Sequence, residues 1–183
     1  MNAAQDLIQQ RGYNAFSYKD LASEVGIRTA SIHYHYPAKG DLGLAVMERY
    51  LEGLEASLAN LDARRRTAKG KLKGFIALYA ETEACGGICL CGSLASDRET
   101  LPTELADAVG AYIERCEAWI AKVLRAGIAD GEFRDVAQPA GLASLLLAGL
   151  QGTLILARGQ AAQHGPGSIQ TLQRTFLESL QPA

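Results

Sequence analysis

The chain has 183 residues, of which 48% are hydrophobic, 7% aromatic and 21% charged. This is the composition of a globular protein with a substantial core, and it excludes a disordered tail, a collagen-like fibre and a low-complexity linker. The formal net charge is −2 at pH 7. Overall charge therefore does not indicate a nucleic-acid-binding protein, and such a function would need a local surface.

Apolar residues recur at intervals of three and four along almost the whole chain, and no strand-like alternation persists. This pattern predicts an all-α fold of about nine helices. The first short helix is expected to end at Gly12, and Ser17 is expected to cap the second, which ends at Gly26. A third short helix covers about Thr29 to Tyr36 and stops at Pro37.

Longer helices follow. The one that begins near Lys39 has apolar residues at i, i+4 spacing, namely Leu42, Val46, Tyr50, Leu54, Leu58 and Leu61. Pro102 opens another long helix. The apolar stretch from Leu142 to Ala157 is short of the roughly 20 residues needed to span a bilayer, so we expect a buried helix and no membrane. The start of the chain has no signal-peptide pattern, and the cytoplasm is the expected compartment.

Residues 18–36 meet the steric demands of a helix-turn-helix. Ala22 is small where the two helices would cross, Gly26 permits a tight turn, and Ile32 fills the angle between the helices. An ordinary αα-hairpin has the same residue types, so this spacing alone leaves DNA binding open. The second helix favours DNA, because residues 25–39 contain no Asp or Glu and phosphate repels carboxylates.

We expect the N-terminal end of the second helix to read base edges through Arg28, Thr29 and Ser31. Tyr34 and Lys39 are expected to contact the flanking phosphates. The predicted DNA-binding residues are Ser17, Tyr18, Arg28, Thr29, Ser31, His33, Tyr34 and Lys39.

The run FSYKDLASEVGIRTASIHYHYPAK, residues 16–39, followed by Leu42, resembles the DNA-binding head of TetR-family transcriptional regulators. The similarity is close over residues 3–45. It implies a head on residues 1–43, a ligand-binding and dimerisation body on residues 44–183, a homodimer on a palindromic double-stranded DNA operator, and repression relieved by a small-molecule effector. Two departures stand out: Arg28 replaces the usual Ser N-cap, and Ile32-His33 replaces Leu-Tyr. The family's base preference therefore cannot be carried over.

The resemblance also implies that the middle helices surround a ligand cavity and that the last two form the dimer interface. The predicted ligand-binding residues are Phe75, Tyr79, Ile88, Cys89, Tyr112, Cys116, Trp119 and Leu150. Any one of them alone is better explained as ordinary core, and the prediction depends on the group. For the interface we expect one apolar face of Leu142, Leu145, Leu146, Leu150 and Leu154, with Leu147 and Ile155 outside that face, completed by Phe176, Leu177 and Leu180.

Three cysteines, Cys85, Cys89 and Cys91, lie within seven residues. A thiol near a helix N-terminus can react with electrophiles or oxidants, so a thiol-dependent sensor is an alternative function and a thiol-dependent enzyme a more remote one. Buried cysteine is also a common apolar filler. Their spacing lacks a paired C-x2-C, and His33 and His35 lie on nearly opposite helix faces. We therefore expect no metal site, no cofactor and no enzymatic activity.

Overall fold

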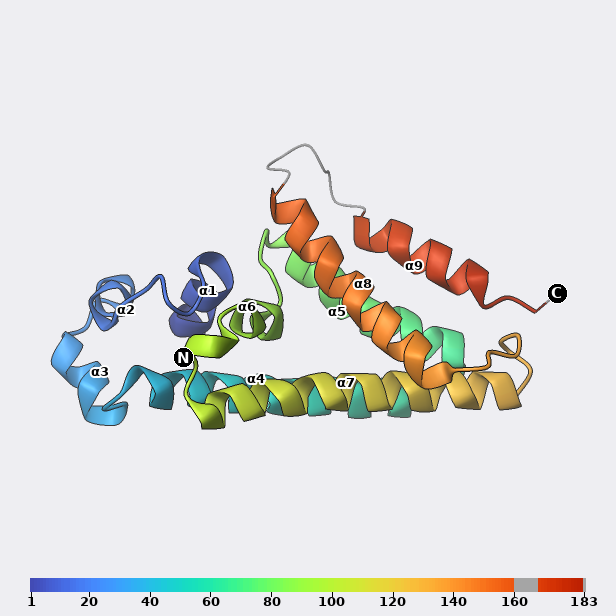
Figure 1. The fold of residues 1–183 in the computed structure, drawn as a ribbon, viewed down its shortest axis with the longest axis horizontal. Helices are drawn as coiled ribbons and strands as arrows, with labels where there is room; N and C mark the ends of the chain where they lie inside the picture. Colours follow the sequence, from blue (N-terminus) through green and yellow to red (C-terminus); the bar gives the residue numbers. More distant parts are fainter. Residues whose placement is uncertain (160–167, 183) are drawn as a thin grey trace. The chain divides into compact units, whose positions relative to one another are not determined.

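The computed structural model describes residues 1–159 and 168–182 of the chain (Figure 1). The elements are α1 (Asn2–Arg11), α2 (Tyr18–Val25), α3 (Thr29–His35), α4 (Lys39–Arg64), α5 (Ala68–Ala84), α6 (Leu90–Ser96), the 3-10 helix η1 (Arg98–Thr100), α7 (Thr103–Ala129), α8 (Pro139–Gly159) and α9 (Ser168–Ser179). The predicted all-α class is confirmed, with nine α-helices and no strand in the described residues.

The chain packs as two compact units. The head unit comprises Met1–Leu54 and Ile88–Ile113, and the body unit comprises Glu55–Gly87 and Glu114–Ala183. Helices α4 and α7 contribute residues to both units. By packing, α6 belongs with α1 and α2 in the head unit. The division after residue 43 follows the expected roles of the two parts and stays a prediction.

Local signals determine the ends of the short helices. Ser17 and Asp20 form a reciprocal capping box at the start of α2, in which the Ser17 amide donates to the Asp20 carboxylate at 2.7 Å and the Asp20 amide donates to Ser17 Oγ at 3.3 Å. Gly12 and Gly26 follow α1 and α2 with φ of 91° and 74°, a backbone region that favours glycine. The predicted starts and stops of these helices are confirmed.

In the body unit, α5, α8 and α9 pack against one another (Figure 1). The buried residues of α8 are Ala143, Leu146, Leu147, Leu150 and Leu154. The single face expected of Leu142, Leu145, Leu146, Leu150 and Leu154 is divided in the structure. Leu146, Leu150 and Leu154 are buried within the body unit together with Leu147, whereas Leu145 is 65% exposed. The stretch is so uniformly apolar that its sequence does not show which side faces the core.

Helix α8 is long and apolar enough to cross a bilayer by length and composition alone. A core helix of a soluble protein meets the same criteria, and five side chains of α8 are buried within the body unit. The helix is therefore weak evidence for a membrane span.

Candidate nucleic-acid interface and effector region

Helices α2 and α3 form the predicted helix-turn-helix. Gly26 ends α2 in the left-handed conformation, and its amide donates to the Ala22 carbonyl at 2.9 Å. Ala22 and Ile32 are buried between the two helices, which pack against each other. The steric roles expected of Ala22, Gly26 and Ile32 are therefore confirmed.

The outer surface of α3 and its N-cap is polar and free of carboxylates. The exposed residues here are Arg28, Ala30, Ser31, His33, Tyr34 and His35, and Thr29 is half-buried. Tyr34 is 83% exposed. Arg28 occupies the N-cap position without making a side-chain capping bond, so its guanidinium group is not used there. This surface offers hydrogen-bond donors and acceptors with no negative charge to repel phosphate.

Tyr18, which was predicted to contact DNA, is turned inward. Its side chain is 8% exposed, and its hydroxyl lies 2.8 Å from the Tyr36 carbonyl oxygen and 2.7 Å from that of Ala38, to which it donates its single proton. Burial raises the pKa of Tyr18 to about 12, because the phenolate would be poorly solvated. We reassign Tyr18 as a residue that positions the corner between α3 and α4.

Lys39 is also engaged within the head unit. Its ammonium group donates to the carbonyl oxygens of Tyr13 and Phe16, both at 2.5 Å, and lies 4.7 Å and 4.3 Å from the centroids of their rings. Burial lowers the pKa of Lys39, since desolvation disfavours the charged form. Instead of the phosphate contact that we expected, the structure shows Lys39 holding the loop between α1 and α2.

A second set of contacts ties the region of α6 and η1 to the same part of the head unit. Asp97 accepts from the Tyr13 amide at 2.9 Å and from the Asn14 side chain at 3.0 Å. Ser93 donates to the Ile8 carbonyl at 2.7 Å, and Gln9 donates to the carbonyl of residue 88 at 2.8 Å. Sequence reasoning missed Ser93 and Asp97, because no local pattern marks side chains that bond to backbone about 80 residues away.

The predicted ligand-binding residues divide between the two units. Ile88, Cys89 and Tyr112 belong to the head unit, and Phe75, Tyr79, Cys116, Trp119 and Leu150 belong to the body unit. In the head unit, Tyr50 Oη lies 3.5 Å from Cys89 Sγ, and the ring of Tyr50 stacks on that of Tyr112 at 5.1 Å. Burial raises the pKa of Tyr50 well above its ordinary value. These side chains form a polar cluster within an otherwise apolar interior.

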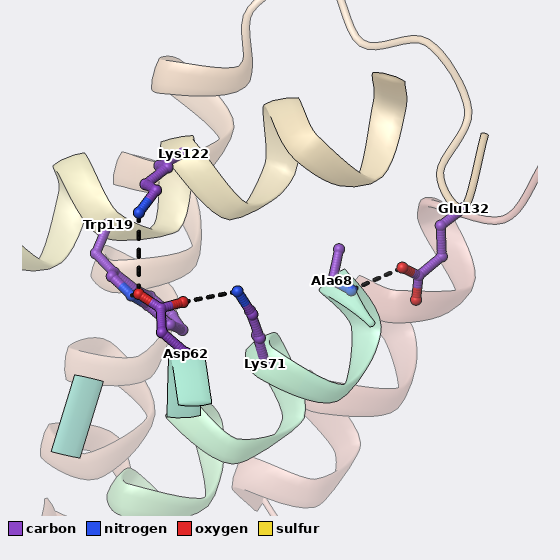
Figure 2. Close-up of polar contacts among 6 residues, drawn as sticks. All are labelled: Asp62, Ala68, Lys71, Trp119, Lys122 and Glu132. Atoms are coloured by element: carbon purple, nitrogen blue, oxygen red, sulfur yellow. Dashed lines mark hydrogen bonds and ion pairs between the residues drawn. The ribbon is translucent and has the colours of Figure 1, made fainter. Parts of the chain in front are cut away.

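In the body unit, an aromatic cluster joins α5 to α7. The Phe75 ring lies 5.7 Å from Tyr79 and stacks on Trp119 at 5.6 Å. The Trp119 indole donates to Asp62 Oδ2 at 3.2 Å, and Lys71 pairs with Asp62 Oδ1 at 2.7 Å (Figure 2). The hydrogen bond from Lys71 is the largest cause that lowers the pKa of Asp62.

Glu132 caps the start of α5 next to this cluster. Its carboxylate accepts from the amides of Ala68 and Lys69 at 2.7 and 2.8 Å, and Figure 2 shows it reaching the first turn of the helix. A carboxylate at this end of a helix satisfies amides that have no partner within the helix. Asp62 and Glu132 therefore fix the beginning of α5, and with it the position of Phe75 one to two turns later.

The positions of the cysteines give little support to a thiol sensor. In the described residues all four are thiols outside any disulfide: Cys85 is exposed, and Cys89, Cys91 and Cys116 are buried. Cys89 and Cys91 are 2% and 1% exposed, which leaves an electrophile no access to their sulfur atoms in this conformation. In the described part of the chain, no group of three or more His, Cys, Asp or Glu side chains could hold a metal ion.

Two sequence families match the chain. The profile described as "Bacterial regulatory proteins, tetR family" matches residues 1–46, and that described as "Tetracyclin repressor-like, C-terminal domain" matches residues 71–165. A curated relative, the transcriptional regulator AcuR of Cereibacter sphaeroides, is 23% identical over 188 residues, covering 96% of this chain and 81% of that protein.

Solved structures agree with this match. A TetR-family transcriptional regulator from Agrobacterium tumefaciens is 31% identical, with a TM-score of 0.92 and coverage of 99% of this chain and 95% of that one. A TetR transcriptional regulator from Legionella pneumophila is 30% identical, with a TM-score of 0.87 and coverage of 98% and 94%.

The Lys39 contacts predict a stability effect. We expect Lys39→Met, which keeps most of the aliphatic stem, to destabilise the protein by about 1–3 kcal/mol because two buried carbonyls lose a charged donor. For a chain of this size that is a Tm lower by several degrees, measured by circular dichroism. Lys19→Met removes an exposed charge from α2 and is the matched control. An equal Tm for both variants would contradict the internal role of Lys39.

The Asp62 contacts predict a pH-dependent stability. The folded-state pKa of Asp62 is lowered, so its contribution is complete above the unfolded value of about 4 and is lost as the pH falls through the folded value. We expect Asp62→Asn to lower the free energy of unfolding by about 1–3 kcal/mol at neutral pH and by less below about pH 4. Urea unfolding followed by circular dichroism measures both.

Lys122→Ala is the control for Asp62, because Lys122 Nζ is 3.9 Å from the carboxylate and its side chain is 73% exposed. We expect a change within about 0.5 kcal/mol for this variant. If the difference between wild type and Asp62→Asn were constant over the whole pH range, the carboxylate would not be the source of the stabilisation.

Proposed function

The chain belongs to the TetR family of bacterial regulatory proteins and is a DNA-binding transcriptional regulator, and from this premise we propose that it represses transcription as a cytoplasmic homodimer on a palindromic operator. A small-molecule effector releases the DNA. The observation that carries this proposal is the α2–α3 helix-turn-helix, in which the outer surface of α3 has polar side chains and no carboxylate. That is the arrangement a helix needs to enter the major groove.

The proposed DNA contacts lie on the exposed side of α3. Arg28, Thr29 and Ser31 are placed to read base edges near the start of the helix, and Tyr34 is exposed enough to reach a phosphate. Ser17 lies at the start of α2, where its amide is held by Asp20. Tyr18 and Lys39 act indirectly, by holding the backbone that supports α3.

The dimer interface is proposed on the outer face of α8. Leu145 and Leu156 are each 65% exposed and lie eleven residues apart, about three helical turns, so they share one face. Gly152 lies on the same face, and a Cβ there would meet nothing within 4 Å, which leaves room for a second helix. Leu177 and Leu180, which we expected at the interface, are buried within the body unit. A second copy of α8 is the partner that this face fits.

The effector is proposed to be a mainly apolar molecule that contacts the aromatic cluster of Phe75, Tyr79 and Trp119. Its binding would release DNA by altering the head unit, in which the bonds of Ser93 and Asp97 to the backbone of the α1 region make α6 and α1 move together. An effector acts this way only if it prefers one position of α6 over another.

Tyr34 tests the proposed DNA surface. We expect Tyr34→Ala to weaken binding to a selected operator and to unrelated duplex DNA alike, by about 3- to 10-fold, because a phosphate contact carries no sequence information. Fluorescence anisotropy with labelled duplexes measures both affinities. Tyr34→Phe keeps the ring and should show most of the same loss. Unchanged affinity for both variants would remove Tyr34 from the interface.

The α8 face is tested by charge. The double variant Leu145→Glu, Leu156→Glu should convert a dimer of 19.5 kDa subunits to monomer in light scattering after size exclusion, since four buried carboxylates would have to lose their water. Asn60→Glu adds a charge to an exposed position of α4 and should stay dimeric. A dimer that survives both leucine substitutions places the interface elsewhere.

A further inference from the structure

One nitrogen of the His33 imidazole lies within hydrogen-bond distance of a backbone carbonyl. Nδ1 lies 3.4 Å from the carbonyl oxygen of Pro37, which follows α3. A carbonyl oxygen can only accept, so in the neutral ring Nδ1 carries the hydrogen. The other nitrogen, Nε2, then has no hydrogen and presents a lone pair. His33 is exposed on α3, so this lone pair is a hydrogen-bond acceptor on the proposed DNA surface.

Tyr18 holds the same ring from another side. The two ring centroids are 4.6 Å apart with the planes at 68°, an edge-to-face contact. Tyr18 is fixed in turn by its hydroxyl, which donates its single proton to the Ala38 carbonyl at 2.7 Å and lies 2.8 Å from the carbonyl oxygen of Tyr36, on the other side of Pro37. The ring contact and the carbonyl that orient His33 therefore belong to one rigid corner. The imidazole is oriented before DNA arrives.

We propose that His33 determines operator specificity by accepting a hydrogen bond from the exocyclic amine of one base in each half-site. In the major groove only adenine N6 and cytosine N4 are donors, whereas guanine and thymine present acceptors at the corresponding edge. His33 therefore favours adenine or cytosine on the strand that it faces and disfavours guanine and thymine. This inference rests on the proposed function, in which α3 enters the major groove.

Selection from a randomised duplex library tests the proposal with the full-length protein. The selection is run at about pH 8, where histidine side chains are ordinarily neutral. Wild type should show one position per half-site with adenine or cytosine enriched. His33→Lys offers only donors, so the same position should change to guanine or thymine while the others stay as they are. His35→Lys, a matched change on the same helix, should leave that position unchanged.

Base analogues test the single hydrogen bond. At that position the selected operator would carry purine in place of adenine, or 2-pyrimidinone in place of cytosine, which removes only the amine. Wild type should lose about 3- to 10-fold in affinity, and His33→Ala should lose no further affinity from the same replacement. Because His33 is exposed, both variants are expected to fold, with a Tm lowered by no more than a few degrees for the lost contact with the Tyr18 ring.

The outcomes separate this inference from the function beneath it. If wild type selects no duplex sequence, the proposed operator binding fails. If wild type selects an operator but His33→Lys leaves every position unchanged, or the analogue weakens His33→Ala as much as wild type, the role of His33 is overturned and the operator binding stands.

Discussion

The position of α3 depends on two side chains, Tyr18 and Lys39, that hydrogen-bond to backbone carbonyls of two loops. Tyr18 donates its proton to the Ala38 carbonyl after α3 and lies close to that of Tyr36, and Lys39 donates to the Tyr13 and Phe16 carbonyls of the loop between α1 and α2. The loss of a donor from a part-buried carbonyl destabilises a fold by up to about 1–3 kcal/mol, so these bonds favour the observed loop conformations. The exposed surface of α3 can therefore be varied for base recognition while the corner beneath it is preserved.

The helix-turn-helix was predictable from sequence because its constraints are local. A small residue, a glycine in the left-handed region and a branched plug lie within eleven residues, and Ser17 with Asp20 marks the start of α2. The inward turn of Tyr18 and Lys39 was not predictable in this way. Both residue types suit a phosphate contact equally well, and only the three-dimensional position of the loop carbonyls assigns them to the interior.

The body was less predictable for two physical reasons. Uniform hydrophobicity of α8 conceals which side is buried, so the exposed Leu145 was grouped with residues that the structure buries, and the buried Leu147 was left out of that group. Long-range bonds such as that of Asp97 to the Tyr13 amide leave no trace in local spacing. Burial of the predicted aromatic residues was foreseeable from composition, whereas their division between two compact units was not. The ligand-binding set therefore stays a prediction.

The hydrogen bond between Trp119 and Asp62 also gives the protein an optical property. Trp119 is the only tryptophan in the chain, so the emission of its indole reports one place in the body unit without any label. The stacked Phe75 ring and the carboxylate of Asp62 define the polarity that this fluorophore experiences. A compound that inserts beside the ring or displaces the carboxylate shifts the emission wavelength. Libraries of unlabelled compounds can thus be screened against the native chain in a simple fluorimeter.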